Sequence, residues 1–155
     1  MSGEVQREAL VRCQSVLPGW RDLWVDDFTF DPPKGFSSFT MGIRAKRPVD
    51  PPAVLYRHLD GKENAILDAD TERGVFLLLG DHDIAAHAYL ADETCRVEAF
   101  HDGRTLTRED VFDPAVQRGI ARELFRLHQL EPAGLPDEPF FELLHRQWSE
   151  LGRPV

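Results

Sequence analysis

The sequence predicts an α+β fold in which a five-stranded antiparallel sheet packs with helices. Three observations predict it: short runs of alternating apolar and polar residues, one helical run inserted among them, and further helical runs on both sides of this region. A chain of 155 residues is long enough for one domain that buries a core without disulfides. We therefore expect a single domain.

Five segments carry the pattern of strands, and turn residues separate them. The break at residues 32–35 divides the first two strands, a Pro-rich connection precedes the third, and Asp92 lies in the turn of the last two. We expect the first three to form an antiparallel meander and the last two a hairpin. The strands are predicted over residues 28–30, 39–43, 53–57, 87–90 and 95–100.

Helical spacing of apolar residues predicts one helix before the sheet, one within it and two after it. Asp113 and Pro114 have the residue types preferred at the N-cap and first position of a helix. Gly80 is either the C-cap of the helix within the sheet or part of a longer helix. The helices are predicted over residues 4–17, 68–79, 113–129 and 138–151.

Composition excludes several classes of function. With 18 basic and 27 acidic residues the net charge is −9, which gives no electrostatic reason to bind nucleic acid or an anionic membrane. No run reaches the roughly 18 apolar residues that span a bilayer, and the N-terminus has no signal-peptide profile. Cys13 and Cys95 fit no zinc or redox spacing. We expect a cytoplasmic protein.

The turn at residues 34–39 is a candidate phosphate-binding loop, because small residues let backbone N–H groups approach a phosphate. A plain hairpin turn is the alternative, and local chemistry alone favours it. Arg57, at the end of the third strand, could hold a phosphate, and Glu72 on the next helix could hold the Arg57 guanidinium. The alternative for this pair is an ion pair on the surface.

Several short motifs occur in one order along the chain. They are Leu-Pro-Gly-Trp-Arg at 17–21, Gly-Phe-Ser-Ser at 35–38, Val-Leu-Tyr-Arg at 54–57, Arg-Val-Glu-Ala-Phe at 96–100 and a helix at 120–128 that ends near Phe125 and His128. With these motifs the chain resembles the N-terminal lobe of the choline/ethanolamine kinases, in the protein-kinase-like and aminoglycoside phosphotransferase superfamily. Lys34 stands where that family usually has the first loop glycine, and Ser38 replaces its usual asparagine.

The resemblance implies an ATP-binding lobe. Ser37 and Ser38 would line the phosphate loop, Arg57 would take the role of the kinase strand lysine, Glu72 would orient it, and the segment from Glu98 to Phe100 would border adenine. The nucleotide-binding residues that it implies are Gly35, Ser37, Ser38, Arg57, Glu72, Glu98, Phe100 and Arg104. The complete enzyme would use ATP with Mg²⁺ to phosphorylate the hydroxyl of choline, ethanolamine or a similar amino alcohol.

The resemblance also implies that the catalytic groups lie outside this chain. In the family the H-x-D-x-x-x-x-N loop and a later aspartate belong to a C-terminal lobe, whereas only four residues follow Leu151 here. The segment 58–64 is one residue short of that loop and precedes the pairing helix, so we interpret it as a connection. We therefore expect no catalytic residue and no metal ligand in this chain, and magnesium ligands in the missing lobe.

Within this interpretation residues 1–155 form a single kinase-like N-terminal lobe. Residues 1–19 are an N-terminal helix, 26–104 the nucleotide-binding sheet and helix, and 113–151 a helical linker toward the absent lobe. The last two helices carry more apolar residues than a small sheet can bury. We expect a homo-oligomer or a partner chain to cover that helical face.

Two other functions stay open. The chain could be a non-catalytic binding or interaction module that keeps the fold of the lobe. It could also be a metal-dependent phosphohydrolase, if Asp83 and His87 lie on one helical face as metal ligands. The sequence indicates no third ligand for such a metal and predicts a sheet, whereas that class of hydrolases is all-helical.

Overall fold

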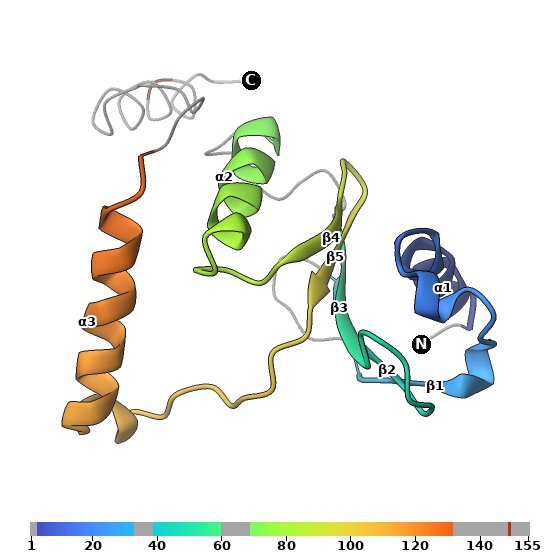
Figure 1. Cartoon of the computed structure of the whole chain (residues 1–155), viewed down its shortest axis with the longest axis horizontal. Coiled ribbons are helices and arrows are strands. Elements are labelled where there is room, and N and C mark those ends of the chain that lie inside the picture. Colours follow the sequence, from blue (N-terminus) through green and yellow to red (C-terminus); the bar gives the residue numbers. More distant parts are fainter. Residues whose placement is uncertain (1–2, 33–38, 60–68, 132–148, 150–155) are drawn as a thin grey trace.

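The structure is a computed structural model that describes residues 3–32, 39–59, 69–131 and 149. Its helices are α1 (Gly3–Val16), α2 (Ala69–Asp81) and α3 (Pro114–His128), and its strands are β1 (Phe28–Phe30), β2 (Phe39–Ala45), β3 (Ala53–His58), β4 (Ala88–Ala91) and β5 (Cys95–Ala99) (Figure 1). The predicted α+β fold class is confirmed. The helix expected over 138–151 lies outside the described residues except for Ser149.

The five strands form one antiparallel sheet in the order β1-β2-β3-β5-β4. β1, β2 and β3 are the predicted meander, and β4 and β5 are the predicted hairpin. The side chain of Asp92 accepts hydrogen bonds from the backbone N–H groups of Thr94 and Cys95, which stabilises the hairpin turn. α2 connects β3 to β4, so the chain crosses the sheet before β5 returns to pair with β3.

Strand alternation divides the sheet into an apolar face and a charged face, because successive side chains point to opposite sides and directly opposed residues share a side. On the apolar face each of the following residues is at most 2% exposed: Met41, Ile43, Val54, Tyr56, Cys95 and Val97. The same alternation places Arg57, Arg96 and Glu98 on the other face. The core therefore lies on one side of the sheet only.

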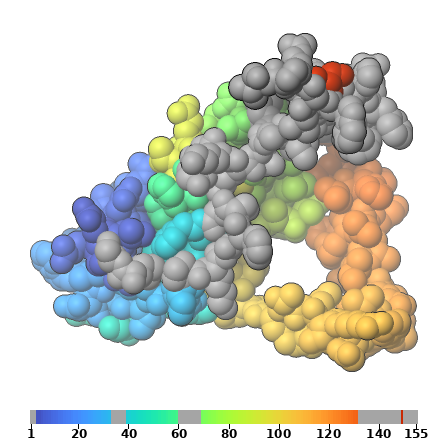
Figure 2. Space-filling model, turned by 180° about the vertical axis from the view of Figure 1, so that it is seen from behind, coloured from blue at the N-terminus to red at the C-terminus, as the bar shows by residue number. Residues whose placement is uncertain are grey.

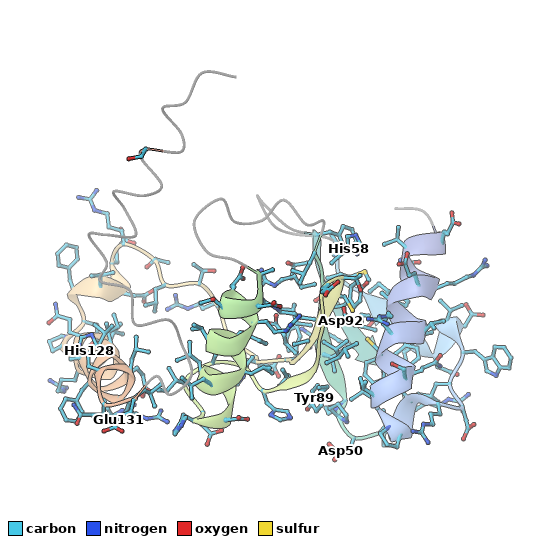
Figure 3. The ribbon with its side chains drawn as sticks, turned by 90° about the horizontal axis from the view of Figure 1, so that it is seen from above. Asp50, His58, Tyr89, Asp92, His128 and Glu131 are labelled. Carbon is cyan, nitrogen blue, oxygen red and sulfur yellow. The ribbon has the colours of Figure 1, made fainter. Side chains whose placement is uncertain are left out.

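α1 covers the apolar face, and α2 lies on the opposite side of the sheet (Figures 1 and 3). Ala9, Leu10 and Cys13 of α1 are buried in the core that the strands form. Both cysteines are free thiols, and burial raises the pKa of the Cys13 thiol to about 12, so that it stays neutral in the core. Trp20 is a fully buried member of this core, and its indole N–H donates a hydrogen bond to the carbonyl of Pro51 at 2.8 Å.

α2 continues through Gly80 to Asp81, so Gly80 is not a C-cap, and the helix is longer than the expected range 68–79. α3 begins as predicted: the Asp113 carboxylate accepts from the Ala115 N–H at 2.7 Å, and Pro114 occupies the first position. Residues 100–109 lead away from the sheet to α3 (Figure 2). Arg126 joins α3 to the rest of the chain through the carbonyls of His82 and Asp83.

Ile43→Ala should lower the free energy of unfolding by about 2 to 4 kcal/mol, because it leaves a cavity in the middle of the apolar face. Thr29→Ala, at an exposed site of β1, is the control and should change it by less than about 1 kcal/mol. Urea denaturation followed by tryptophan fluorescence measures both values. Equal losses in the two variants would contradict the placement of the core on one face.

Candidate functional site

Four charged side chains meet on the sheet face that is turned toward α2. Arg57 comes from β3, Arg96 and Glu98 from β5, and Glu72 from α2. The Arg57 Nε lies 3.4 Å from a carboxylate oxygen of Glu98, and a terminal guanidinium nitrogen of Arg96 lies 2.9 Å from a carboxylate oxygen of Glu72. Arg57 and Arg96 stand directly opposite each other on neighbouring strands. Two positive and two negative charges therefore alternate across three elements.

The two charged residues on β5 are buried: Arg96 is 8% and Glu98 is 5% exposed. A charge removed from water needs an opposite charge and hydrogen bonds close by, or folding becomes costly. Arg96 also lies over the ring of Phe76 on α2, 4.7 Å from the ring centre, which adds a cation–π contact. Its buried Nε has no hydrogen-bond partner among the residues that the structure describes. The Arg96 guanidinium thus connects β5 with α2, and its Nε–H is not used in that contact.

The ion pairing differs from the sequence prediction, which joined Arg57 to Glu72. Among the described residues the structure pairs Arg57 with Glu98 and Glu72 with Arg96. Arg57 and Glu72 nevertheless belong to one charged cluster, because each pairs with a residue of β5. Sequence analysis missed Arg96 as a site residue. The sequence could have indicated it, because Arg96 and Glu98 are two residues apart on one strand and therefore lie on the same face. That face also carries Arg57.

The candidate phosphate loop lies outside the described residues, and so do Gly35, Ser37 and Ser38. The strands on either side of it are described. Phe39 is opposite His58 and Thr40 is opposite Arg57, so Arg57 lies at the sheet end to which the 33–38 connection is attached. Figure 3 marks this end of β3 with His58, and the opposite end with Asp50 in the loop before the strand. Arg57 and the connection therefore share one end of the sheet.

Phe100 lies beyond β5, and Arg44 of β2 covers its ring. The Arg44 guanidinium carbon is 4.0 Å from the ring centre. Its nitrogens lie 3.8 Å from the Asp31 carboxylate and 3.6 Å from the Asp102 carboxylate. A Cβ atom at Gly42 would lie 3.2 Å from the Phe100 ring. Because glycine has no Cβ, Asp31 and Phe100 can approach the backbone of β2 closely. Sequence analysis did not single out Arg44 or Asp31.

Arg104 lies away from this cluster, in the connection that leads to α3. It makes two hydrogen bonds to the Asp110 carboxylate, at 2.5 and 2.8 Å, and its side chain is 67% exposed. The Arg104 guanidinium, helped by donors from Thr107, holds the pKa of the Asp110 carboxyl well below its usual range. The structure therefore brings together the described candidate residues Arg57, Glu72 and Glu98, but it places Arg104 against Asp110.

The structure contradicts the helical arrangement on which the metal-site alternative depended. α2 ends at Asp81, and Asp83 follows with a left-handed backbone (φ 53°), so Asp83 and His87 do not share a helical face. The His87 ring instead packs edge-on against Tyr89, with the ring centres 5.2 Å apart. Within the described ranges, no group of three or more His, Cys, Asp and Glu side chains could hold a metal ion. The same residues include no helix that is long and apolar enough to cross a membrane.

A groove of about 630 Å³ lies beside α1, on the side of the sheet away from the charges. Leu10, Val11 and Trp24 line it, and Gln14 at its edge donates to the carbonyls of Trp20 and Leu23. Gln14 therefore holds residues 20–23 against α1, and its side-chain N–H groups are used within the fold. The candidate site is therefore the charged face and not this groove.

Known proteins show which family and fold this chain is similar to. The family model described as choline/ethanolamine kinase matches residues 35–153. A choline kinase from Cryptosporidium parvum Iowa II is similar in structure, with a TM-score of 0.74 and 21% identity over 91% of this chain and 41% of that chain. An ethanolamine kinase from Plasmodium vivax has a TM-score of 0.58 and 24% identity over 94% of this chain and 38% of that chain.

At these identities the two structures show a shared fold. The chain spans about two fifths of the length of both kinases. No curated protein sequence matches it.

Glu72→Gln should lower the free energy of unfolding by about 1 to 2 kcal/mol, because it removes the charged partner of the buried Arg96. We expect a loss in the lower part of the free-energy range for charged hydrogen bonds, because the Glu72 side chain is 30% exposed and water screens its charge. Asp70→Asn is the matched control on the same helix, with a side chain 79% exposed, and should cost less than about 0.5 kcal/mol. Urea denaturation of both variants is the measurement, and a control that costs as much as Glu72→Gln would refute the assignment.

Proposed function

The chain belongs to the choline/ethanolamine kinase family, and from that premise we propose that its 155 residues form the ATP-binding lobe of a small-molecule kinase. The complete enzyme transfers the γ-phosphate of ATP to the hydroxyl of choline, ethanolamine or a similar amino alcohol, and releases ADP and a proton. The observation that carries the proposal is the gathering of Arg57, Glu72 and Glu98 on one face, at or near the sheet end that bears the candidate phosphate loop.

In this proposal Arg57 binds the phosphates of ATP together with Gly35, Ser37 and Ser38 of the loop. Its side chain is 34% exposed, so the guanidinium can reach a ligand, and its fork of donors matches phosphate oxygens. Glu72 acts one step further away, because it helps to set where the guanidiniums of the cluster point. Phosphoryl transfer depends mainly on such positioning and on charge neutralisation.

Adenine is proposed to lie toward the other end of this face, near Glu98 and Phe100. The Phe100 ring already stacks with the Arg44 guanidinium, and an aromatic ring of this kind also offers a flat surface to a base. Arg104 remains a proposed nucleotide contact, and to reach the nucleotide it must leave Asp110.

Magnesium is required for transfer of this kind, but the described residues do not fit its ligation. They contain no group of three carboxylates or other metal ligands. From the resemblance to the family, we propose that the metal ligands and the base that accepts the hydroxyl proton belong to a C-terminal lobe. No step at this chain's residues is assigned to the metal.

α3 supports the proposal that another polypeptide surface packs on this lobe. Its apolar residues Ile120, Leu124 and Phe125 are 41%, 49% and 64% exposed. An apolar stripe of this kind on an amphipathic helix usually marks an interaction surface. We propose a second copy of the chain or a partner chain as its cover, and a cytoplasmic location for the assembly.

The second candidate function is a non-catalytic nucleotide-binding module with the same fold. The charged face supports it equally, because Arg57, Glu72 and Glu98 suffice for a binding role and none of them is a base for the hydroxyl. Turnover separates the two functions, whereas nucleotide binding is common to both.

Arg57→Ala should weaken binding of ATP by about 1 to 3 kcal/mol, or roughly 5- to 150-fold, because it removes a charge-assisted hydrogen bond to phosphate. Arg73→Ala, which removes a guanidinium from α2 that pairs with Asp70, is the control and should leave the affinity unchanged. Isothermal titration with ATP and Mg²⁺ measures both. The same affinity in wild type and Arg57→Ala, or no binding at millimolar ATP, would count against the proposed site.

The purified 155-residue chain should show no multiple turnover with choline or ethanolamine at saturating magnesium, because the resemblance to the family assigns the groups that neutralise and position the transferred phosphate to a C-terminal lobe. ADP release is the measurement, with the Asp60→Asn variant as a check on the segment 58–64. Turnover that Asp60→Asn abolishes would show that this segment is more than a connection.

A further inference from the structure

We propose that Arg96 is a positioning residue of the nucleotide site, which takes over the Glu98 carboxylate when Arg57 turns from Glu98 to the phosphates. In the same exchange Glu72 leaves Arg96 and pairs with Arg57. The inference rests on the proposed nucleotide-binding function and assigns to Arg96 a role that sequence analysis did not give it.

Glu98 creates the need for an exchange. Its side chain is 7% exposed, and its ion pair is with Arg57 at 3.4 Å. If Arg57 moved to a phosphate and nothing replaced it, a buried carboxylate would stay without a positive partner, which is among the most costly changes inside a protein. Phosphate binding by Arg57 therefore requires a second cation for Glu98.

Arg96 is placed to be that cation. Arg96 and Glu98 are two residues apart on β5, so their side chains leave the strand on the same face, and Arg96 stands directly opposite Arg57. The buried Nε of Arg96 has no acceptor within the described part of the chain. A guanidinium carries five N–H donors, so Arg96 can bind Glu98 by a rotation of its side chain without a shift of the strands.

The surroundings favour a change of partner over a departure of Arg96. The Phe76 ring, 4.7 Å from the guanidinium carbon, lies against Arg96, and the side chain is only 9% exposed. Glu72 is the more accessible member of its pair, with a side chain 30% exposed, so it can leave Arg96 at lower cost. After the exchange both carboxylates still have a guanidinium: Glu98 has Arg96, and Glu72 has Arg57.

The simpler alternative is that Arg96 only holds α2 on the sheet. The two roles differ in what happens when Arg57 is withdrawn. If the pairs are static, loss of Arg57 leaves Glu98 alone at once, whether Arg96 is present or not. If the pairs exchange, Arg96 protects Glu98, and the cost appears only when both arginines are absent.

A first test needs no nucleotide, because Arg57→Met withdraws the guanidinium as a phosphate would. Urea midpoints are measured for Arg57→Met, Arg96→Met and the double variant. Exchange predicts a double-variant shift larger than the sum of the single shifts. It also predicts that adding Glu98→Gln to the double variant removes most of this extra shift in the urea midpoint. The triple variant keeps the test informative if the double variant is unfolded. Additive shifts, or an excess that Glu98→Gln leaves in place, would overturn the proposal.

A second test uses isothermal titration with ATP and Mg²⁺. Arg96→Met should weaken ATP binding about tenfold in the wild-type background. In this variant, movement of Arg57 to the phosphates leaves the buried Glu98 carboxylate without a positive partner. In the Glu98→Gln background the same substitution should change the affinity less than about twofold, because no buried charge is left. Arg96→Lys, which keeps a cation, should recover part of the loss.

Equal losses from Arg96→Met in the two backgrounds would show a purely structural role and refute the exchange. If wild-type chain binds no ATP, the proposed function fails, and the urea measurements still decide whether Arg96 can replace Arg57 at Glu98. The two failures are therefore distinguishable.

Discussion

Arg96 and Glu98 bring two opposite charges into the interior on a single strand, and each must lie beside a partner from another element. A charge away from water is stable only when an opposite charge and hydrogen bonds replace its hydration. Glu98 finds Arg57 on β3, and Arg96 finds Glu72 on α2. This requirement fixes where α2 lies on the sheet, and it brings together the charges that the proposed function needs.

Because side chains alternate along each strand, the sheet has its buried apolar residues on one face and its charged residues on the other. Residues such as Val54 and Val97 point to the α1 side and are fully buried in the core. Their neighbours Arg57, Arg96 and Glu98 point to the α2 side. Because the buried apolar residues of the strands lie on one face, the other face can carry the ion pairs of Arg57 with Glu98 and of Arg96 with Glu72. The Arg44 contact with Phe100 extends this polar side toward the proposed adenine end.

The family match and the fold place this charged face in a kinase lobe. The match over residues 35–153 covers the strands β2 to β5 and all of α2 and α3. Because the chain spans about two fifths of the two similar kinases, a surface on which further protein packs is consistent with the exposed apolar residues of α3. Binding and positioning are the roles that the described residues can supply.

Local patterns in the sequence predicted the described α-helices and strands and the neighbours within the meander and the hairpin, but not the pairing of β3 with β5. Alternation marked five strands, Asp113 and Pro114 marked the start of α3, and short motifs identified the family. Gly35, Ser37 and Ser38 stay predictions, because they lie outside the described residues. Arg57 and Glu72 were predicted to form a salt bridge or to lie within easy reach of one, whereas among the described residues Arg57 pairs with Glu98 and Glu72 with Arg96.

Only the tertiary structure decided those partners. The paired residues are 41 and 24 positions apart, so spacing along the chain does not determine which carboxylate a guanidinium pairs with. Which carboxylate lies nearer a guanidinium depends on the register of β3 with β5 and on where α2 rests on the sheet. Those placements arise only when the strands pair and α2 packs on the charged face, whereas residue types and spacing determine only which side of a strand a charge occupies.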